Sequence, residues 1–81
     1  MTVVHQPEHS RFIASMDNPE ARLEYELKPQ QVVDFTYTFV PESQRGKGIA
    51  EELVRTGLAW ARQGGFRIEA SCWYVRRFLR E

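Results

Sequence analysis

The chain has 81 residues, of which 42% are hydrophobic and 12% aromatic, so it can form a small core and is too apolar for a disordered segment. Its 11 basic and 11 acidic residues cancel, which argues against a nucleic-acid-binding protein that relies on a broad basic face. A single cysteine excludes an internal disulfide and most structural zinc sites, and it suits a reducing compartment. No apolar run reaches signal-peptide or membrane-span length, so we expect one cytoplasmic domain over residues 1–81, without membrane contact.

The N-terminal segment, residues 1–9, predicts a short edge strand. The strand should stop at Pro7, because proline has no backbone N–H to donate to a sheet. His5 and His9 are expected to face solvent, since no cluster of Cys, His or carboxylate accompanies them as metal ligands.

Two antiparallel strands are predicted next. Residues 11–16 are strand-like, and Asp-Asn-Pro-Glu at 17–20 has the composition of a turn between strands. Residues 21–28 alternate apolar and charged side chains, the pattern of a sheet with one buried and one wet face.

The longest apolar run, residues 31–40, follows a turn at Lys28-Pro29-Gln30 and predicts a central strand covered by helix on at least one side. Pro41 should end this strand and free the backbone near Val40. The period of two assigns the side chains to two faces: Val33, Phe35, Tyr37 and Phe39 on one, and Val32, Asp34, Thr36, Thr38 and Val40 on the other.

The second half of the chain predicts helix, strand and helix. An apolar stripe at spacings of three and four runs from Gly48 to Gln63, and Gly64-Gly65 should stop that helix. Residues 66–71 alternate as a short strand, and residues 73–79 have the spacing of a terminal helix. A meander followed by helix, strand and helix is an α+β fold with one parallel or splayed strand pair.

The stretch from Val40 to Ala50 joins the central strand to the long helix and predicts an anion-binding loop. The first amides of a helix lack intrahelical acceptors, and the helix dipole, Arg45 and Lys47 all favour a bound anion. Gly46 and Gly48 would let a ligand approach the backbone. On the glycine spacing alone, a plain strand-to-helix turn without a ligand is an equally good interpretation.

Two familiar phosphate-binding patterns do not fit this loop. A Walker loop has four residues between its glycines and ends in Gly-Lys-Ser/Thr, but Ile49 follows Gly48. A dinucleotide fingerprint has a third glycine or alanine where Glu51 stands, and it needs an open parallel sheet that this chain is too short to build.

The loop resembles that of a known superfamily. Arg45-Gly46-Lys47-Gly48-Ile49-Ala50 is similar to the pattern Arg/Gln-x-x-Gly-x-Gly/Ala of the GNAT superfamily of N-acetyltransferases. The likeness extends from Phe35 to Phe78, through Cys72-Trp73-Tyr74-Val75, and points to its minimal, YjdJ-like single-domain subgroup. It implies a minimal GNAT-like fold and acetyl transfer from acetyl-coenzyme A to an amine, without a metal.

The resemblance also assigns cofactor-binding residues. The pyrophosphate of acetyl-coenzyme A would be held by Arg45 and by the backbone amides of the loop, and the pantetheine arm would pair with the backbone of the freed strand end at Val40. The residues that supply these amides are Gly46, Lys47, Gly48, Ile49 and Ala50.

Cys72 and Tyr74 are the candidate catalytic residues. Cys72 lies at the start of the predicted last helix, whose dipole, helped by Arg76 and Arg77, would stabilise a thiolate; a buried, unreactive cysteine is the alternative. The resemblance makes Tyr74 a proton donor to the departing coenzyme A thiolate, with plain aromatic packing as the alternative.

No residue stands out as the general base. The superfamily often has a glutamate on the strand before the loop, and here the nearest carboxylates are Asp34, Glu42 and Glu69. Either water and an already deprotonated amine suffice, or Cys72 takes the acetyl group first and passes it on.

Two rival functions remain open at this stage. The superfamily's usual helices between its first two strands have no counterpart, since only residues 17–20 separate those runs. A coenzyme A-binding sensor or interaction module with little catalysis is therefore the main alternative, and a small structural domain is a third. Neither the amine acceptor nor the choice between monomer and homodimer is readable from the sequence, although an exposed Trp60 or Trp73 would make a homodimer plausible.

Overall fold

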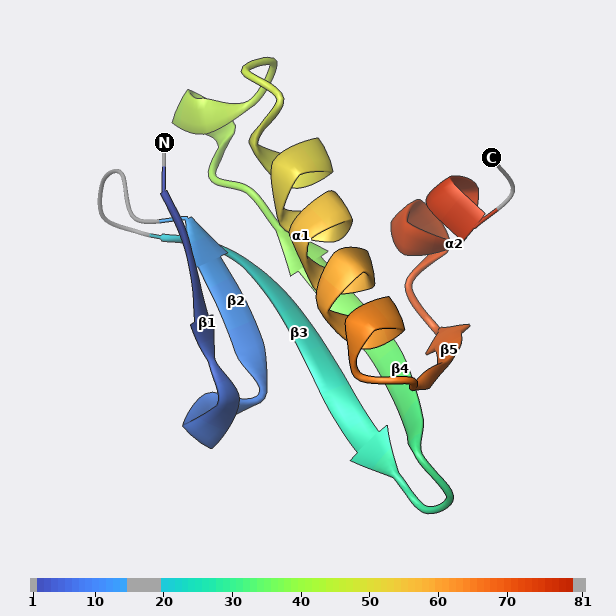
Figure 1. Cartoon of the computed structure of the whole chain (residues 1–81). Helices are drawn as coiled ribbons and strands as arrows, with labels where there is room; N and C mark the ends of the chain where they lie inside the picture. Colours follow the sequence, from blue (N-terminus) through green and yellow to red (C-terminus); the bar gives the residue numbers. More distant parts are fainter. Residues whose placement is uncertain (1, 15–19, 80–81) are drawn as a thin grey trace.

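The computed structural model describes residues 2–14 and 20–79, which form a five-stranded sheet and two α-helices (Figure 1). The sheet order follows the chain, β1-β2-β3-β4-β5, and every pair is antiparallel except β4–β5. The predicted α+β order of meander, helix, strand and helix is confirmed. The elements are β1 (Val3–Gln6), β2 (Arg11–Ala14), β3 (Ala21–Lys28), β4 (Val32–Phe39), α1 (Ile49–Gln63), β5 (Arg67–Ala70) and α2 (Trp73–Leu79), with short 3₁₀ helices at Pro7–His9 and Glu42–Gln44.

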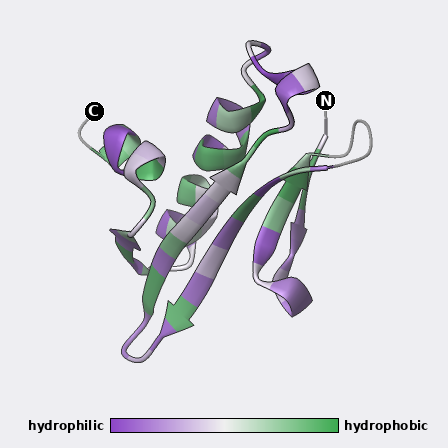
Figure 2. Ribbon diagram, turned by 180° about the vertical axis from the view of Figure 1, so that it is seen from behind, coloured by the Kyte–Doolittle hydropathy of each residue, from purple (hydrophilic) through white to green (hydrophobic). Residues whose placement is uncertain are grey.

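The core lies between the sheet and α1. The helix crosses one face of the sheet and leaves the opposite face without a helix among the described residues (Figures 1 and 2). Its apolar stripe is buried as predicted, and each fully buried large side chain stabilises the fold by about 1.5–3 kcal/mol. The buried residues of α1 are Ile49, Leu53, Val54, Gly57, Leu58 and Ala61, and Trp60 packs against them partly buried.

Gly57 sets how closely α1 approaches the sheet. A Cβ atom at this position would lie 2.8 Å from Cδ2 of Leu23 and 3.1 Å from Cε1 of Phe35. The absence of a side chain therefore lets the helix backbone pack directly on β3 and β4. The helix ends at Gly64 and Gly65, as predicted, and Gly65 has a positive φ of 72°.

The prediction that His5 faces solvent is wrong. On β1, its ring stacks on Phe12 with centroids 4.2 Å apart, and its Nε2 is 2.7 Å from the Tyr25 hydroxyl. Trp60 of α1 meets the same ring edge-on at 4.9 Å. Burial lowers the pKa of His5, an effect that Glu8 partly opposes. The predicted exposure of His9 is confirmed, and the turn expected around 17–20 lies, apart from residue 20, outside the described residues.

A β-bulge at Thr36 corrects the predicted faces of β4. Phe35 and Tyr37 pair with consecutive residues of β3, so Thr36 has no residue opposite it. An extra residue reverses the alternation of side chains beyond it. Phe35 is fully buried, whereas Tyr37 is 46% exposed. The prediction that Tyr37 and Phe39 share a face with Val33 and Phe35 is therefore wrong.

The rings of Tyr37 and Phe39 lie beside Arg22 on the sheet face that no described helix covers. The Arg22 guanidinium is 5.6 Å from the ring centroid of Tyr37 and 4.9 Å from that of Phe39, and its Nε pairs with Glu24 at 2.6 Å.

No helix of the described residues is long and apolar enough to cross a membrane.

Candidate functional site

The loop before α1 combines two glycines of positive φ with a helix start that no side chain caps. Gly46 and Gly48 have φ angles of 80° and 75°, in the left-handed region that side chains rarely adopt. Gly48 is the N-cap of α1, and no side chain caps the helix there. The first intrahelical bond runs from the Glu52 amide to the Gly48 carbonyl, at 3.1 Å, so the amides of Ile49, Ala50 and Glu51 have no acceptor within the helix.

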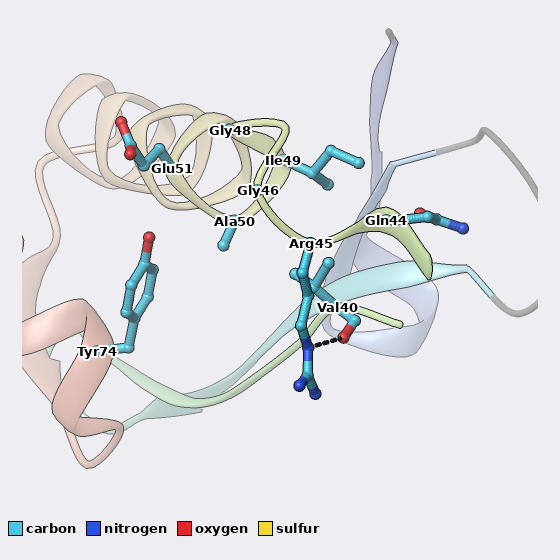
Figure 3. Close-up of a pocket in the computed structure, with 9 residues that line it drawn as sticks. All are labelled: Val40, Gln44, Arg45, Gly46, Gly48, Ile49, Ala50, Glu51 and Tyr74. Carbon is cyan, nitrogen blue, oxygen red and sulfur yellow. Dashed lines mark hydrogen bonds between the residues drawn. The ribbon is translucent and has the colours of Figure 1, made fainter. Parts of the chain in front are cut away.

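Open space lies in front of these glycines. A Cβ built on Gly46 or Gly48 would meet no atom within 4 Å, so the positive φ, and not crowding, favours glycine at both positions. A cavity of about 260 Å³ lies at this loop. It is lined by Val40, Gln44, Arg45, Gly46, Gly48, Ile49, Ala50, Glu51 and Tyr74 (Figure 3).

The loop has two cationic side chains, Arg45 and Lys47, which have different surroundings. Arg45 points away from Gly46 and Gly48, and its Nε donates to the Val40 carbonyl at 3.1 Å (Figure 3). The backbone of Val40, predicted to pair with the pantetheine arm, thus already accepts a hydrogen bond from Arg45 at its carbonyl. Lys47 is exposed and does not line the cavity, although its backbone belongs to the loop.

A second, larger cavity of about 700 Å³ adjoins the first, since Val40, Arg45, Ala50 and Tyr74 line both. It forms where β4 and the chain after β5 diverge. The last strand pair is Phe35–Ala70, and just beyond it the Cys72 amide still donates to the Phe35 carbonyl, at 3.1 Å. We call this cavity the splay groove. Its lining is Thr36, Tyr37, Thr38, Phe39, Val40, Arg45, Ala50, Ser71, Cys72, Trp73 and Tyr74.

Cys72 is half-buried in the splay groove, with Sγ 3.6 Å from Oγ1 of Thr38. Burial raises the pKa of its thiol, but the Val75 amide, the Thr38 hydroxyl and the Tyr74 amide outweigh it, so the pKa lies below the ordinary value. The arginines expected to help are engaged elsewhere. Arg76 donates to the Ser71 carbonyl at 3.3 Å, and Arg77 lies over the rings of Trp73 and Tyr74.

Tyr74 connects the two cavities. Its ring stands beside the first turn of α1 (Figure 3). Burial and the negative charge of Glu51 raise the pKa of its hydroxyl, although Arg77 and Arg55 oppose the shift. The group therefore keeps its proton at neutral pH and can act as a proton donor.

The carboxylates that sequence reasoning considered as general bases do not line the splay groove. Asp34 is bound to Ser71, Glu69 lies 3.5 Å from Lys28, and Glu42 is exposed. Within residues 2–14 and 20–79, no three or more His, Cys, Asp or Glu side chains gather as metal ligands would.

Sequence reasoning missed three residues of this site. Thr38 lies against the Cys72 thiol because the bulge at Thr36 turns it toward the helix side, opposite the buried Leu23. Gln44, only 3% exposed, lines the loop cavity. Ser71, which precedes Cys72, is held by a buried carboxylate. The Thr-x-Thr run before Val40 was a usable signal, but nothing local marked the bulge.

The fold, a mixed five-stranded sheet with two helices, matches that of a solved GCN5-like protein. A solution NMR structure of a GCN5-like putative N-acetyltransferase from Staphylococcus aureus matches with a TM-score of 0.75 at 20% identity, covering 98% of this chain and 78% of that one. The model of the GCN5-related N-acetyl-transferase family matches residues 11–81, so the chain belongs to that family.

The chain is also similar to curated proteins of two vertebrates. It is 31% identical to Protein NATD1 of Bos taurus and 28% identical to Protein NATD1 of Homo sapiens, in each case over 98% of this chain and 72% of the relative. Family and fold support an acyltransferase activity in general. The narrower YjdJ-like subgroup stays a prediction.

Proposed function

We propose that the protein is an acetyl-coenzyme A-dependent N-acetyltransferase that acts on an amine and is formed by a single domain over residues 1–81. The observation that carries this proposal is the continuity of the two cavities: the loop with Gly46 and Gly48 opens into the splay groove that holds Cys72 and Tyr74. A diphosphate on the loop amides would leave a thioester arm free to enter the groove.

The residues present fit this co-substrate. The amides of residues 46–50 would hold the pyrophosphate, and Arg45 could add charge-assisted bonds with the nitrogens that do not contact Val40. Acetyl-coenzyme A would supply an activated acetyl thioester. Tyr74 holds a proton that it could give to a leaving thiolate, and Thr38 and the first amides of α2 hold the Cys72 sulfur in place.

Two routes are compatible with this site. In direct transfer, the amine nitrogen attacks the thioester carbon, the carbon–sulfur bond breaks, and the nitrogen releases its proton to water. In the two-step route, the Cys72 thiolate would attack the thioester carbon and expel the coenzyme A thiolate, which would take the Tyr74 proton. The amine would then attack the acetylated Cys72, break its carbon–sulfur bond and release its own proton to water. We favour direct transfer, because the sulfur is half-buried and bonded to Thr38.

Binding is tested by the thermal midpoint with acetyl-coenzyme A, free coenzyme A and adenosine diphosphate. Ligand at about 100 times its Kd adds about 2.7 kcal/mol, which should raise the midpoint of a domain this small by about 10 °C or more. Gly48→Glu should abolish the shift through its charge and its backbone strain.

The control for strain is Gly65→Glu. Gly65 also has a positive φ and open space around it, yet it lies at the far end of α1 and lines neither cavity. This variant should be destabilised and still show the full ligand shift. Equal loss of the shift in both variants, or no shift in the parent protein, would contradict the loop as a coenzyme A site.

Catalysis is tested by acetyl transfer to a panel of amines. Tyr74→Phe should lower kcat by roughly 10²–10⁴-fold while leaving the coenzyme A shift intact, because only the proton donor is lost. Cys72→Ser should keep most of the activity if transfer is direct. Loss of transfer in Cys72→Ser with normal coenzyme A binding would replace the direct route by the two-step route.

A coenzyme A-binding sensor or interaction module is the second candidate. It is favoured by the sheet face that no described helix covers and by the six-residue connection from Ala14 to Ala21, which is too short for helices that wall an acceptor site. A full coenzyme A shift without transfer to any amine of the panel would favour it.

A further inference from the structure

Asp34 is a buried carboxylate that the proposed reaction does not use. It is 4% exposed, in the middle of β4. A buried charge is costly unless other groups pair with it. Its Oδ1 accepts the Ser71 amide at 2.8 Å, its Oδ2 accepts the Ser71 hydroxyl at 2.7 Å, and Lys28 Nζ lies 3.5 Å from Oδ2. Burial disfavours its ionised form, but the Ser71 bonds and Lys28 outweigh this, and the pKa of Asp34 lies below its ordinary value.

These bonds lie where the β4–β5 ladder stops. Asp34 pairs with Glu69 and Phe35 with Ala70 in the last two rungs, and Ser71 is the first residue beyond the strand. From there the chain turns away to begin α2, which opens the splay groove. The Asp34 side chain thus binds both the amide and the hydroxyl of Ser71, at the point where the chain leaves the sheet.

The residue after Ser71 is Cys72. Its amide is bound to the Phe35 carbonyl at 3.1 Å, so two adjacent residues of β4 hold two adjacent residues at the mouth of the groove. The thiol must lie within reach of Thr38 on one side and of the Tyr74 and Val75 amides on the other. A shift of Ser71 would move the sulfur relative to both sets of donors.

We propose that Asp34 is a positioning residue, which clamps Ser71 and thereby fixes the Cys72 sulfur and the width of the splay groove. Its place in catalysis rests on the proposed function, but the clamp itself does not. A carboxylate is suited to this task because it accepts from the amide and the hydroxyl at once and cannot donate. The neutral amide of asparagine keeps the shape and loses one of the two acceptors.

The test is the pH dependence of Cys72 alkylation by iodoacetamide in Asp34→Asn, since the alkylation rate follows the thiolate fraction. The two possible effects have opposite signs. Removing a negative charge near the thiol would favour the thiolate and lower its pKa. Losing the alignment of the Thr38, Tyr74 and Val75 donors would raise it. We expect a rise, and alkylation near neutral pH slower by roughly threefold or more, where one pKa unit is about tenfold.

Two further variants complete the test. Ser71→Ala keeps the amide bond and loses the hydroxyl bond, so the thiol pKa should rise by less than in Asp34→Asn; it also serves if Asp34→Asn does not fold. Lys28→Met is the matched control, because it removes the contacts with Asp34 and Glu69 at the exposed side and leaves Ser71 clamped. Its alkylation profile should match that of the parent protein.

The proposal is overturned if Asp34→Asn lowers the thiol pKa or leaves it unchanged, or if Lys28→Met alters it as much. A merely structural Asp34 would change the unfolding midpoint but not the alkylation profile of the folded protein. In acetyl transfer, kcat should fall in Asp34→Asn because the splay groove that admits the thioester changes its width, while the coenzyme A shift persists because the glycine loop lies in the adjoining cavity. If the parent protein binds no coenzyme A, the proposed function fails and the alkylation result still decides the clamp.

Discussion

At the scale of single residues, partners from distant segments decide what a side chain does. His5 belongs to a four-residue edge strand, yet Phe12, Tyr25 and Trp60 enclose its ring. The environment of the Cys72 thiol likewise depends on Thr38, which lies on the opposite wall of the splay groove. Neither environment follows from neighbouring residues in the sequence, because each arises from pairing between strands or from contact of the sheet with a helix.

His5 predicts a pH dependence of stability. Its pKa is lower in the folded protein than the ordinary value of 6.5, so the unfolded chain binds the proton more readily. The stabilisation by neutral His5 is therefore complete above pH 6.5 and is lost as the pH falls from there toward the lower folded pKa. Urea unfolding at about pH 7.5 and about pH 5 should show a larger loss in the parent protein than in His5→Gln, which cannot titrate. Parallel profiles for the two proteins would contradict this.

At the scale of elements, β4 and α1 position the site. The bulge at Thr36 divides β4 into a half that contributes Val33 and Phe35 to the core and a half that lines the groove. The helix presents the loop amides at its first turn and is pressed against the sheet at Gly57. The distance between loop and groove thus depends on close packing at the middle of the helix.

Gly57→Leu should destabilise the fold. Its side chain would collide with Leu23 and Phe35, and overpacking of this kind costs about 1–3 kcal/mol, more than the gain of about 1 kcal/mol in helix propensity. Ala59→Leu places the same side chain on the exposed face of α1 and should change little. Denaturant unfolding of both variants measures the difference. Equal stabilities would show that the helix does not pack tightly at this position.

At the scale of the whole molecule, the radius of gyration is 12.0 Å, against about 12 Å for a compact domain of this length. Two tryptophans report on its opposite sides. Trp60 packs with Phe12, Tyr25 and Phe66 under the meander, whereas Trp73 is 65% exposed on α2 beside the groove.

A single domain should unfold in one cooperative step. In Trp73→Phe the remaining tryptophan is Trp60, so the fluorescence reports on the packing of the meander. In Trp60→Phe the remaining tryptophan is Trp73, so the fluorescence reports on α2. In each variant the fluorescence and circular dichroism midpoints should coincide, as expected for two-state unfolding of a small domain. An earlier fluorescence transition in Trp60→Phe alone would mean that α2 unfolds separately, and it would refute the single domain.

Local sequence patterns by themselves determined the kinds and order of the elements, the ends of α1 and the loop with Gly46 and Gly48. Apolar period, proline and glycine act over a few residues, so such features are readable without long-range information. The predicted strand 21–28 and helix 73–79 match β3 and α2 for this reason. The family was readable too, because its loop pattern is contiguous.

Only the tertiary structure decided the bulge at Thr36, the outward turn of Tyr37, the partial burial of His5 and the hydrogen bonds between Asp34 and Ser71. Each depends on strand register or on contacts between residues far apart in the chain; Asp34 and Ser71 are 37 positions apart. The alternation of apolar and polar residues along a strand does not reveal a bulge, because one inserted residue exchanges the two faces without changing the local composition. The loop that could bind the co-substrate was therefore visible in the sequence, whereas the geometry around the thiol depends on how β4 pairs with its neighbours.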